Sequence, residues 1–263
     1  MRYSIIILLA IGVLLLTYSL VCSFELRRFG SAGVECAFPD VIGNPAAVAN
    51  IENIGIIFSY ENNFSLKELG ENFLEFAVPN KFLPFYTNFS LFGKPKYFQK
   101  TKGELLVGKR ITENLLAGCG LGYGISSYPE GFETIKREDA KLGVQFSPVN
   151  FLTLGTKIEY ISVDGEKSCP VKVGFMISPV NWLMVGCDIG WVSGADSPDF
   201  RVAERANIGE WLILRFGIAS PPTRISFGGE SGYRQMLFFW GYGFHPDLGS
   251  SYAAGIGVRL GKP

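Results

Sequence analysis

The fold is decided by Gly143-Val-Gln-Phe-Ser-Pro148-Val-Asn-Phe151-Leu152-Thr-Leu-Gly155, which returns 31 residues later as Gly174-Phe-Met-Ile-Ser-Pro179-Val-Asn-Trp182-Leu183-Met-Val-Gly186. Looser copies surround the turns Thr112-Glu113-Asn114 and Gly209-Glu210. Each copy is an alternating run, a tight turn and a second alternating run. Alternation with a period of two is typical of a strand whose faces meet different surroundings, and the turn residues fix where the strand reverses. Consecutive hairpins of this kind predict one large antiparallel sheet that must protect its edges.

The alternation also indicates which surroundings each face meets. From Leu152 to Tyr160 one face is almost entirely apolar and ends in an aromatic residue, and the same holds for the runs from Leu183 and Leu115. The opposite faces are small or charged. Eight residues of tilted strand climb roughly 20 Å, close to the apolar band of a membrane barrel with its aromatic girdles. A soluble sandwich with the apolar face inward is the alternative, and the glycine-rich polar faces and terminal aromatics argue against it.

The first residues have the pattern of an export signal. Arg2 is followed by an apolar run of twelve residues, Ile5 to Leu16, and Val21-Cys22-Ser23 offers a cleavage site. This pattern predicts a signal peptide over residues 1–23, and the run is shorter than the about 20 apolar residues of a spanning helix. An uncleaved anchor and a lipoprotein cut before Cys22 are the alternatives.

We predict an all-β fold, an antiparallel transmembrane β-barrel of about 14 strands, with 12 also possible. Residues 24–53 are irregular and rich in Gly, Ala, Pro and Asn, and we expect them to form a hatch inside or beneath a barrel of residues 54–263. The strand pattern is weak at two places: residues 61–70, which could hold a short helix, and residues 200–208, where alternation is poor. The strands are expected near 54–60, 71–78, 83–93, 103–110, 115–126, 134–147, 151–163, 168–178, 182–193, 200–208, 211–219, 223–228, 233–244 and 251–260.

Composition excludes some functions. The chain has 24 basic and 24 acidic residues, so it lacks the charge of a nucleic-acid-binding protein. Five cysteines without a CxxC pair predict no metal site of that type, and we expect no cofactor. A disulfide between Cys36 and Cys169 is left open.

Two motif matches weaken on inspection. Gly103 to Arg110 nearly matches a phosphate-binding loop but lacks the Ser or Thr after its lysine, and it reads as a strand. The single histidine, His245, lies near Ser250 and Ser251, a pairing that lipid hydrolases of the outer membrane use. A lone loop histidine is more often structural, so we predict that the protein is not an enzyme and keep a lipid-modifying enzyme as a remote alternative.

Several charged residues share the face opposite the apolar stripe. Inside a barrel, buried charges persist when they pair or meet water. They could form an ion-pair network that stiffens a narrow lumen, or a polar path for a solute. These predicted lumen charges are Lys141, Lys157, Glu159, Lys172, Asp188, Arg215 and Arg259.

A resemblance to a known group rests on the N-terminal region. Phe29-Gly30-Ser31-Ala32-Gly33 is followed by Asp40-Val41-Ile42-Gly43-Asn44-Pro45-Ala46-Ala47-Val48-Ala49. This order is similar to the start of PorV/PorQ-like barrels within the FadL (fatty-acid transporter) superfamily, and the Pro-x-Asn-Trp-Leu turns are also similar. Asn44, Pro45 and Ala46 match the group's hatch motif. Gly43 replaces an aromatic residue, and the chain ends in Leu260-Gly-Lys-Pro263 rather than in an aromatic.

The resemblance implies a fourteen-stranded barrel of the bacterial outer membrane with its hatch in the lumen. It also implies a function: a non-enzymatic binding or scaffold component linked to type IX secretion, with secretion-system proteins as partners. The alternative is a FadL-like passive transporter of hydrophobic small molecules. Among the inward residues, only Leu237 and Phe239 are expected to be large and apolar. Because a solute pocket is normally lined by apolar and aromatic side chains, we expect weak fatty-acid binding at most.

Overall fold

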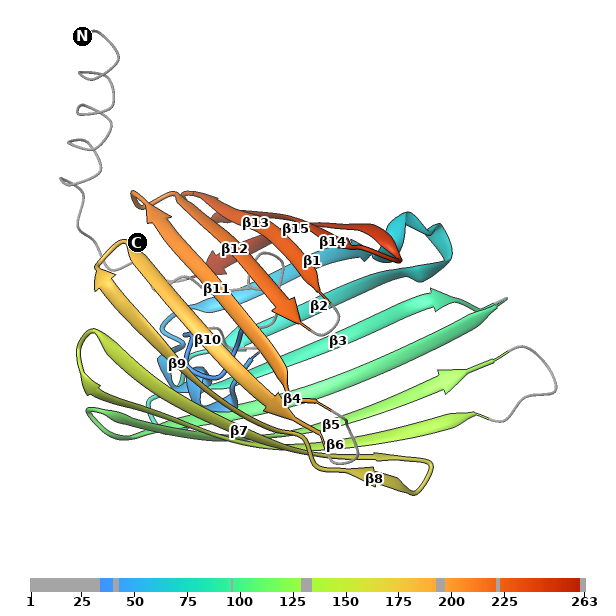
Figure 1. Ribbon diagram of the computed structural model, residues 1–263, viewed down its shortest axis with the longest axis horizontal. Coiled ribbons are helices and arrows are strands. Elements are labelled where there is room, and N and C mark those ends of the chain that lie inside the picture. Colours follow the sequence, from blue (N-terminus) through green and yellow to red (C-terminus); the bar gives the residue numbers. More distant parts are fainter. Residues whose placement is uncertain are drawn as a thin grey trace, which may run out of the picture.

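A computed structural model describes residues 34–39, 43–95, 97–128, 134–192, 197–220 and 223–260. Within these residues, fourteen long antiparallel strands form a closed ring (Figure 1). The first seven are β1 (Ile54–Asn62), β2 (Gly70–Val78), β3 (Phe85–Lys94), β4 (Phe98–Thr112), β5 (Leu115–Ser127), β6 (Ile135–Val149) and β7 (Leu152–Val163). The other seven are β9 (Val171–Val180), β10 (Leu183–Trp191), β11 (Asp199–Ile208), β12 (Leu212–Ser220), β13 (Arg224–Tyr233), β14 (Met236–His245) and β15 (Gly249–Leu260).

Each strand pairs with its neighbours in sequence, and the ring closes where the first strand meets the last. Ile54 lies opposite Leu260 in the β1–β15 pair. The short strand β8 (Glu166–Ser168) pairs with β7 and extends that hairpin beyond the ring. The predicted fourteen-stranded barrel is therefore confirmed. Closure removes the exposed edges that an open sheet of this size would present.

The alternation predicted from the sequence separates the outside of the barrel from the inside. On β7, Leu154 and Ile158 are each 43% exposed, whereas Lys157 between them is 1% exposed. An apolar outer face around a polar inner face is the reverse of a water-soluble sandwich, so that alternative is wrong. The outer face suits the hydrocarbon core of a bilayer, where a closed barrel satisfies every backbone hydrogen bond internally.

The two ends of the barrel differ in their connections. We call one end the tight-turn end. It carries the connections β2–β3, β4–β5, β6–β7, β9–β10, β11–β12 and β13–β14. Exposed aromatic residues mark five of them: Phe82, Phe151, Trp182, Trp211 and Tyr233. Aromatic side chains at this level form a girdle where a membrane meets water. We call the opposite end, which carries the remaining connections, the outer end.

The two weak places of the sequence have structural explanations. Residues 61–70 hold two short 3-10 helices, η2 (Asn63–Ser65) and η3 (Lys67–Leu69), as the sequence allowed. Residues 200–208 do form a strand, β11. Its alternation is poor because a charged residue, Glu204, occupies an outward position, while Ala203 faces inward. Among the described residues, no helix combines the length and apolar character needed to cross a membrane.

Part of the N-terminal region lies inside the ring. We call residues 34–39 and 43–53 the plug; it includes the 3-10 helix η1 (Pro45–Asn50). In Figure 1 this blue segment lies within the barrel, and η1 packs against the inner faces of β4, β5 and β6. The predicted signal peptide over residues 1–23, and residues 24–33 of the predicted hatch, lie outside the described residues.

Candidate functional site: the plugged lumen

The predicted hatch motif begins the helix of the plug. The Asn44 side chain caps η1 by accepting a hydrogen bond from the Ala46 N–H at 3.0 Å, and Pro45 occupies the start of the helix, where a missing N–H does no harm. The Asn44 amide donates to three carbonyls, of Cys36 at 2.7 Å, Val144 at 3.3 Å and Thr156 at 3.2 Å. One buried side chain therefore ties the plug to itself, to β6 and to β7.

Glycines on the inner faces leave room for the plug. A Cβ added to Gly143 would lie 1.9 Å from Asn44 Oδ1, and one added to Gly155 would lie 2.0 Å from the Cys36 carbonyl oxygen. The same addition at Gly118 would meet the Pro45 backbone at 2.3 Å. These strands lack side chains where the plug backbone comes closest, which explains why their inner faces are rich in glycine.

The charged residues of β7, β9 and β10 hold residues 34–39. Glu35 is buried, and its carboxylate accepts from Lys157 at 2.7 Å and also pairs with Lys172. The Asp188 carboxylate accepts from the backbone N–H groups of Glu35, at 2.6 Å, and Cys36, at 3.0 Å. The Gln145 amide donates to the carbonyls of Cys36 and Phe38. We call the set Glu35, Asn44, Gln145, Lys157, Lys172 and Asp188 the polar anchor.

The structure places the other predicted lumen charges on the inner face as well. Lys141 pairs with Glu104, and Glu159 pairs with Lys157 at 2.7 Å. On a separate part of the wall, Arg215 and Arg259 lie 3.5 and 3.7 Å from the Glu230 carboxylate. All seven predicted positions therefore lie inside the barrel, in two groups, each with an oppositely charged or hydrogen-bonding partner.

Sequence reasoning missed the acidic partners of these cations. Glu104 and Glu230 share the inward parity of their strands, so extending the alternation to β4 and β13 would have found them. The parity of β6 would likewise have found Asp139, which pairs with Lys102 and Arg137. Glu35 had no such signal, because the plug has no periodicity.

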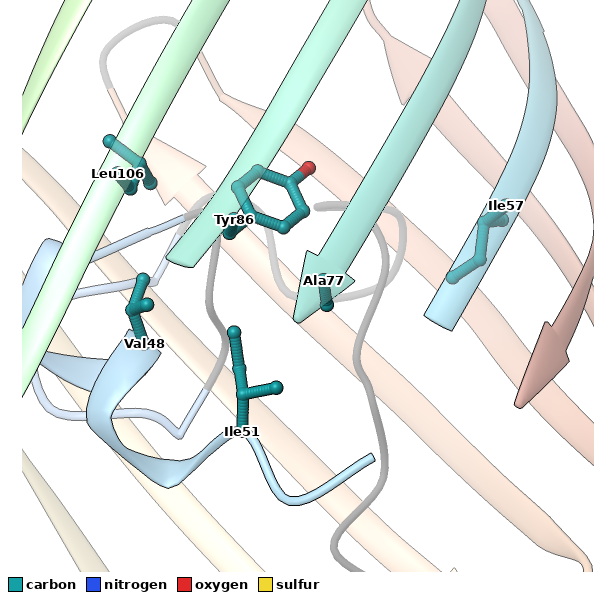
Figure 2. Close-up of a cluster of buried hydrophobic side chains, with 6 residues drawn as sticks. All are labelled: Val48, Ile51, Ile57, Ala77, Tyr86 and Leu106. Carbon is teal, nitrogen blue, oxygen red and sulfur yellow. The ribbon is translucent and has the colours of Figure 1, made fainter. Parts of the chain in front are cut away.

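A cluster of buried apolar side chains joins the second half of the plug to another part of the wall. Val48 of η1 and Ile51 just after it pack with residues of β1 to β4 (Figure 2). Phe239 of β14, which is partly buried, packs against the cluster. The Tyr86 hydroxyl within it donates to Glu75 at 2.7 Å, so the polar end of that ring is satisfied. We call this set the apolar seam: Val48, Ile51, Ile57, Ala77, Tyr86 and Leu106.

The apolar seam corrects one expectation. Leu237 and Phe239 do face inward, but they are not the only large apolar residues there, since Ile57, Tyr86 and Leu106 are each at most 1% exposed. A second inward cluster joins Val34, Ala37 and Phe38 of the plug to Met176 and Ala203 of the wall. The interior of the barrel therefore contains apolar clusters between the plug and the wall that the sequence pattern did not predict.

Cys36 and Cys169 are the two cysteines whose pairing the sequence left open. Cys36 is buried in the plug and Cys169 is exposed, and both are free thiols, so the pairing left open from the sequence is not present. Burial, together with the negative charges of Asp188 and Glu35, raises the pKa of the Cys36 thiol far above its usual range. A seated plug therefore keeps this thiol protonated and unreactive.

The geometry gives the hydrolase alternative no support. His245 Nδ1 accepts from the backbone N–H groups of Asp247 and Leu248, both at 3.2 Å, which engages the nitrogen within its own turn. Ser250 Oγ lies 2.6 Å from the Tyr242 hydroxyl, and Ser251 Oγ accepts from the Phe64 N–H. Within the described part of the chain, no group of three His, Cys, Asp or Glu residues is arranged to hold a metal ion.

Comparisons with known proteins place the fold. No model of a known protein family and no curated protein sequence matches the chain. The toluene transporter TodX of Pseudomonas putida has a similar structure, with a TM-score of 0.61 at 9% identity over 91% of this chain and 99% of that one. A TodX monoaromatic hydrocarbon channel mutant gives 0.63 at 10% identity over 90% and 98%. A FadL homologue of Pseudomonas aeruginosa gives 0.55 at 10% identity over 91% and 99%.

These likenesses show that the chain has the fold of the outer-membrane barrels TodX and the FadL homologue. Membership of the FadL superfamily and an outer-membrane location stay predictions. The narrower PorV/PorQ assignment is not shown.

Proposed function

We propose that the chain is a passive outer-membrane channel for small hydrophobic molecules, the alternative that its sequence left open. The observation that carries the proposal is the apolar seam. It lies between the plug and the wall of β1 to β4. A hydrophobic solute needs apolar side chains along its path, because a lumen lined only by paired charges would leave it against polar groups and ordered water.

The similar structures support this choice. These structures are those of a toluene transporter, a monoaromatic hydrocarbon channel and a FadL homologue. The secretion scaffold, with secretion-system proteins as partners, stays a prediction, because no described residue singles out such a partner. The lipid of the outer membrane remains the expected partner of the apolar outer face.

The test is solute entry into proteoliposomes that contain the full chain. Toluene and a long-chain fatty acid serve as probes, and empty liposomes as the reference. Phe239→Lys should abolish any entry above the reference, because it places a charge beside the apolar seam. Phe239→Leu keeps an apolar side chain there and should retain entry.

A second control separates the seam from the lumen as a whole. Gly243→Lys introduces the same charge on the same strand and the same inner face, four residues toward the outer end, where a Cβ meets only Ser251 at 3.9 Å. It should reduce entry less than Phe239→Lys. Entry no faster than in empty liposomes, or equal loss in both lysine variants, would overturn the proposal.

A further inference from the structure

The outer face of the barrel carries few charges, and two of them lie where a membrane is apolar. On the fourteen described strands of the ring the charged residues that point outward are Lys109, Lys136, Glu138 and Glu204. Glu138 lies opposite Tyr123 and Lys136 beside the outer hairpin at Asp164, so both are at the outer aromatic level. Lys109 and Glu204 lie below that level, on the apolar band.

Glu204 lies in the middle of this band. It is four residues from Phe200 near the outer end of β11 and four from Ile208, where that strand ends. Its partners across the sheet are Val185 on β10 and Phe216 on β12, both apolar and both on the outer face. Its side chain is exposed, and no ion pair or hydrogen bond joins it to another described residue.

Lys109 is the complementary charge. It is exposed on the outer face of β4, between Val107 and Ile111 and opposite Ala117 of β5, and it also has no partner among the described residues. It lies three residues from the end of β4 at Thr112, and Glu204 lies four from the end of β11. The two opposite charges are therefore at comparable depths above the tight-turn end.

A charged side chain that faces lipid at this depth is unfavourable, and such residues are usually paired or functional. Both positions have a small neighbour, Ala117 beside Lys109 and Ala206 after Glu204. Small residues let two membrane-embedded surfaces approach closely. We propose that a second copy of this chain docks on the β10–β12 outer face, and that its Lys109 pairs with Glu204. The proposal concerns the outside of the barrel and does not depend on the channel function.

The positions of the two faces set the form of the assembly. Between β4 and β11, five strands of the ring lie on one side and seven on the other, so the faces are nearly opposite. A contact between different, nearly opposite faces is heterologous and continues from copy to copy. The expected assembly is a row of barrels that all have the same orientation in the membrane, rather than a two-fold symmetric dimer.

The first test is cross-linking between two tagged populations of the full chain in bilayers, with the native cysteines replaced by alanine. One population carries Glu204→Cys and the other Lys109→Cys. A disulfide between the two tags supports the proposal. A Glu204→Cys product with itself would show a symmetric contact, and no product at all would show separate barrels. Either result overturns it.

The second test is charge exchange, read by the oligomeric state in mild detergent and by cross-linking of the native lysines. Glu204→Lys and Lys109→Glu should each lose the assembly, and the double variant Glu204→Lys/Lys109→Glu should recover it. Glu138→Lys, a like charge change at the aromatic level, is the control and should keep it. Heat-modifiable gel migration shows that each barrel has folded. Assembly that survives both single exchanges in folded barrels would refute the pairing.

Discussion

The two halves of the plug are held in different ways. Residues 34–39 and Asn44 are held by the polar anchor, through ion pairs and hydrogen bonds with fixed geometry to β6, β7, β9 and β10, in addition to the apolar packing of Val34, Ala37 and Phe38. Within residues 45–51, Val48 and Ile51 lie in the apolar seam against β1 to β4, where the contacts are close packing without direction. A buried charge that loses its partner is strongly unfavourable, whereas apolar surfaces can separate around an apolar guest. The polar anchor therefore fixes the position of the plug, and the apolar seam is the side that can yield to a solute.

The largest expected effect comes from removing the acid of the polar anchor. Glu35→Ala leaves Lys157 buried without its carboxylate partner from the plug, and breaking a buried pair costs about 3–5 kcal/mol. The plug should then leave its site far more often. The measurement is maleimide labelling of Cys36 in a chain whose other cysteines are alanine, and the rate should rise about a hundredfold or more.

The matched variant is Glu35→Gln, which keeps hydrogen-bonding capacity without the charge. It should fall between the native chain and Glu35→Ala. An unchanged labelling rate in Glu35→Ala would show that the ion pairs do not hold the plug.

The second effect concerns the apolar seam. Leu106 is fully buried, and Leu106→Ala should lower the free energy of unfolding by about 2–5 kcal/mol. It should also increase entry of toluene into proteoliposomes, because it opens space beside Val48, while Cys36 labelling changes little. If Cys36 labelling rises as much as in Glu35→Ala, the plug is a single unit and the distinction between its halves is wrong.

The third effect lies between the two regions. Asn44→Ala removes the cap of η1 and the donor to three carbonyls, and leaving buried polar groups unsatisfied costs about 1–3 kcal/mol. We expect an intermediate rise in Cys36 labelling. Asn44→Ser keeps an acceptor for the Ala46 N–H but cannot reach the carbonyls. Equal behaviour of the two variants would assign the effect to the carbonyls rather than to the cap.

The smallest effect is that of salt. Raising NaCl from 0.1 to 1 M shortens the screening length from about 10 to about 3 Å, yet buried pairs are screened much less than exposed ones. The side chains of Lys157 and Glu35 are 1% and 2% exposed, so Cys36 labelling should hardly change. A strong increase would mean that water and ions reach the polar anchor.

The barrel was predictable from sequence because its outer face is uniform. The strand expected over 115–126 is observed as Leu115–Ser127, since its alternation is sharp. The apolar seam was not predictable, because Leu105 and Leu106 are both apolar although they face opposite sides, and alternation then carries no parity. The partners of Glu35 were hidden for another reason: an irregular segment gives no direction for its side chains. Asn44 could be singled out because a helix start has a local signature.

The pairing of β1 with β15 also determines when the ring can close during folding. Ile54 cannot meet Leu260 until nearly the whole chain has been delivered, so the contact that completes the ring joins the most distant strands in sequence. Contacts of such long separation make folding slow. Until they form, both edge strands stay unpaired, with apolar outer faces that favour aggregation in water. We therefore expect this chain to need a chaperone until it has inserted into a membrane, for longer than any single hairpin takes to form.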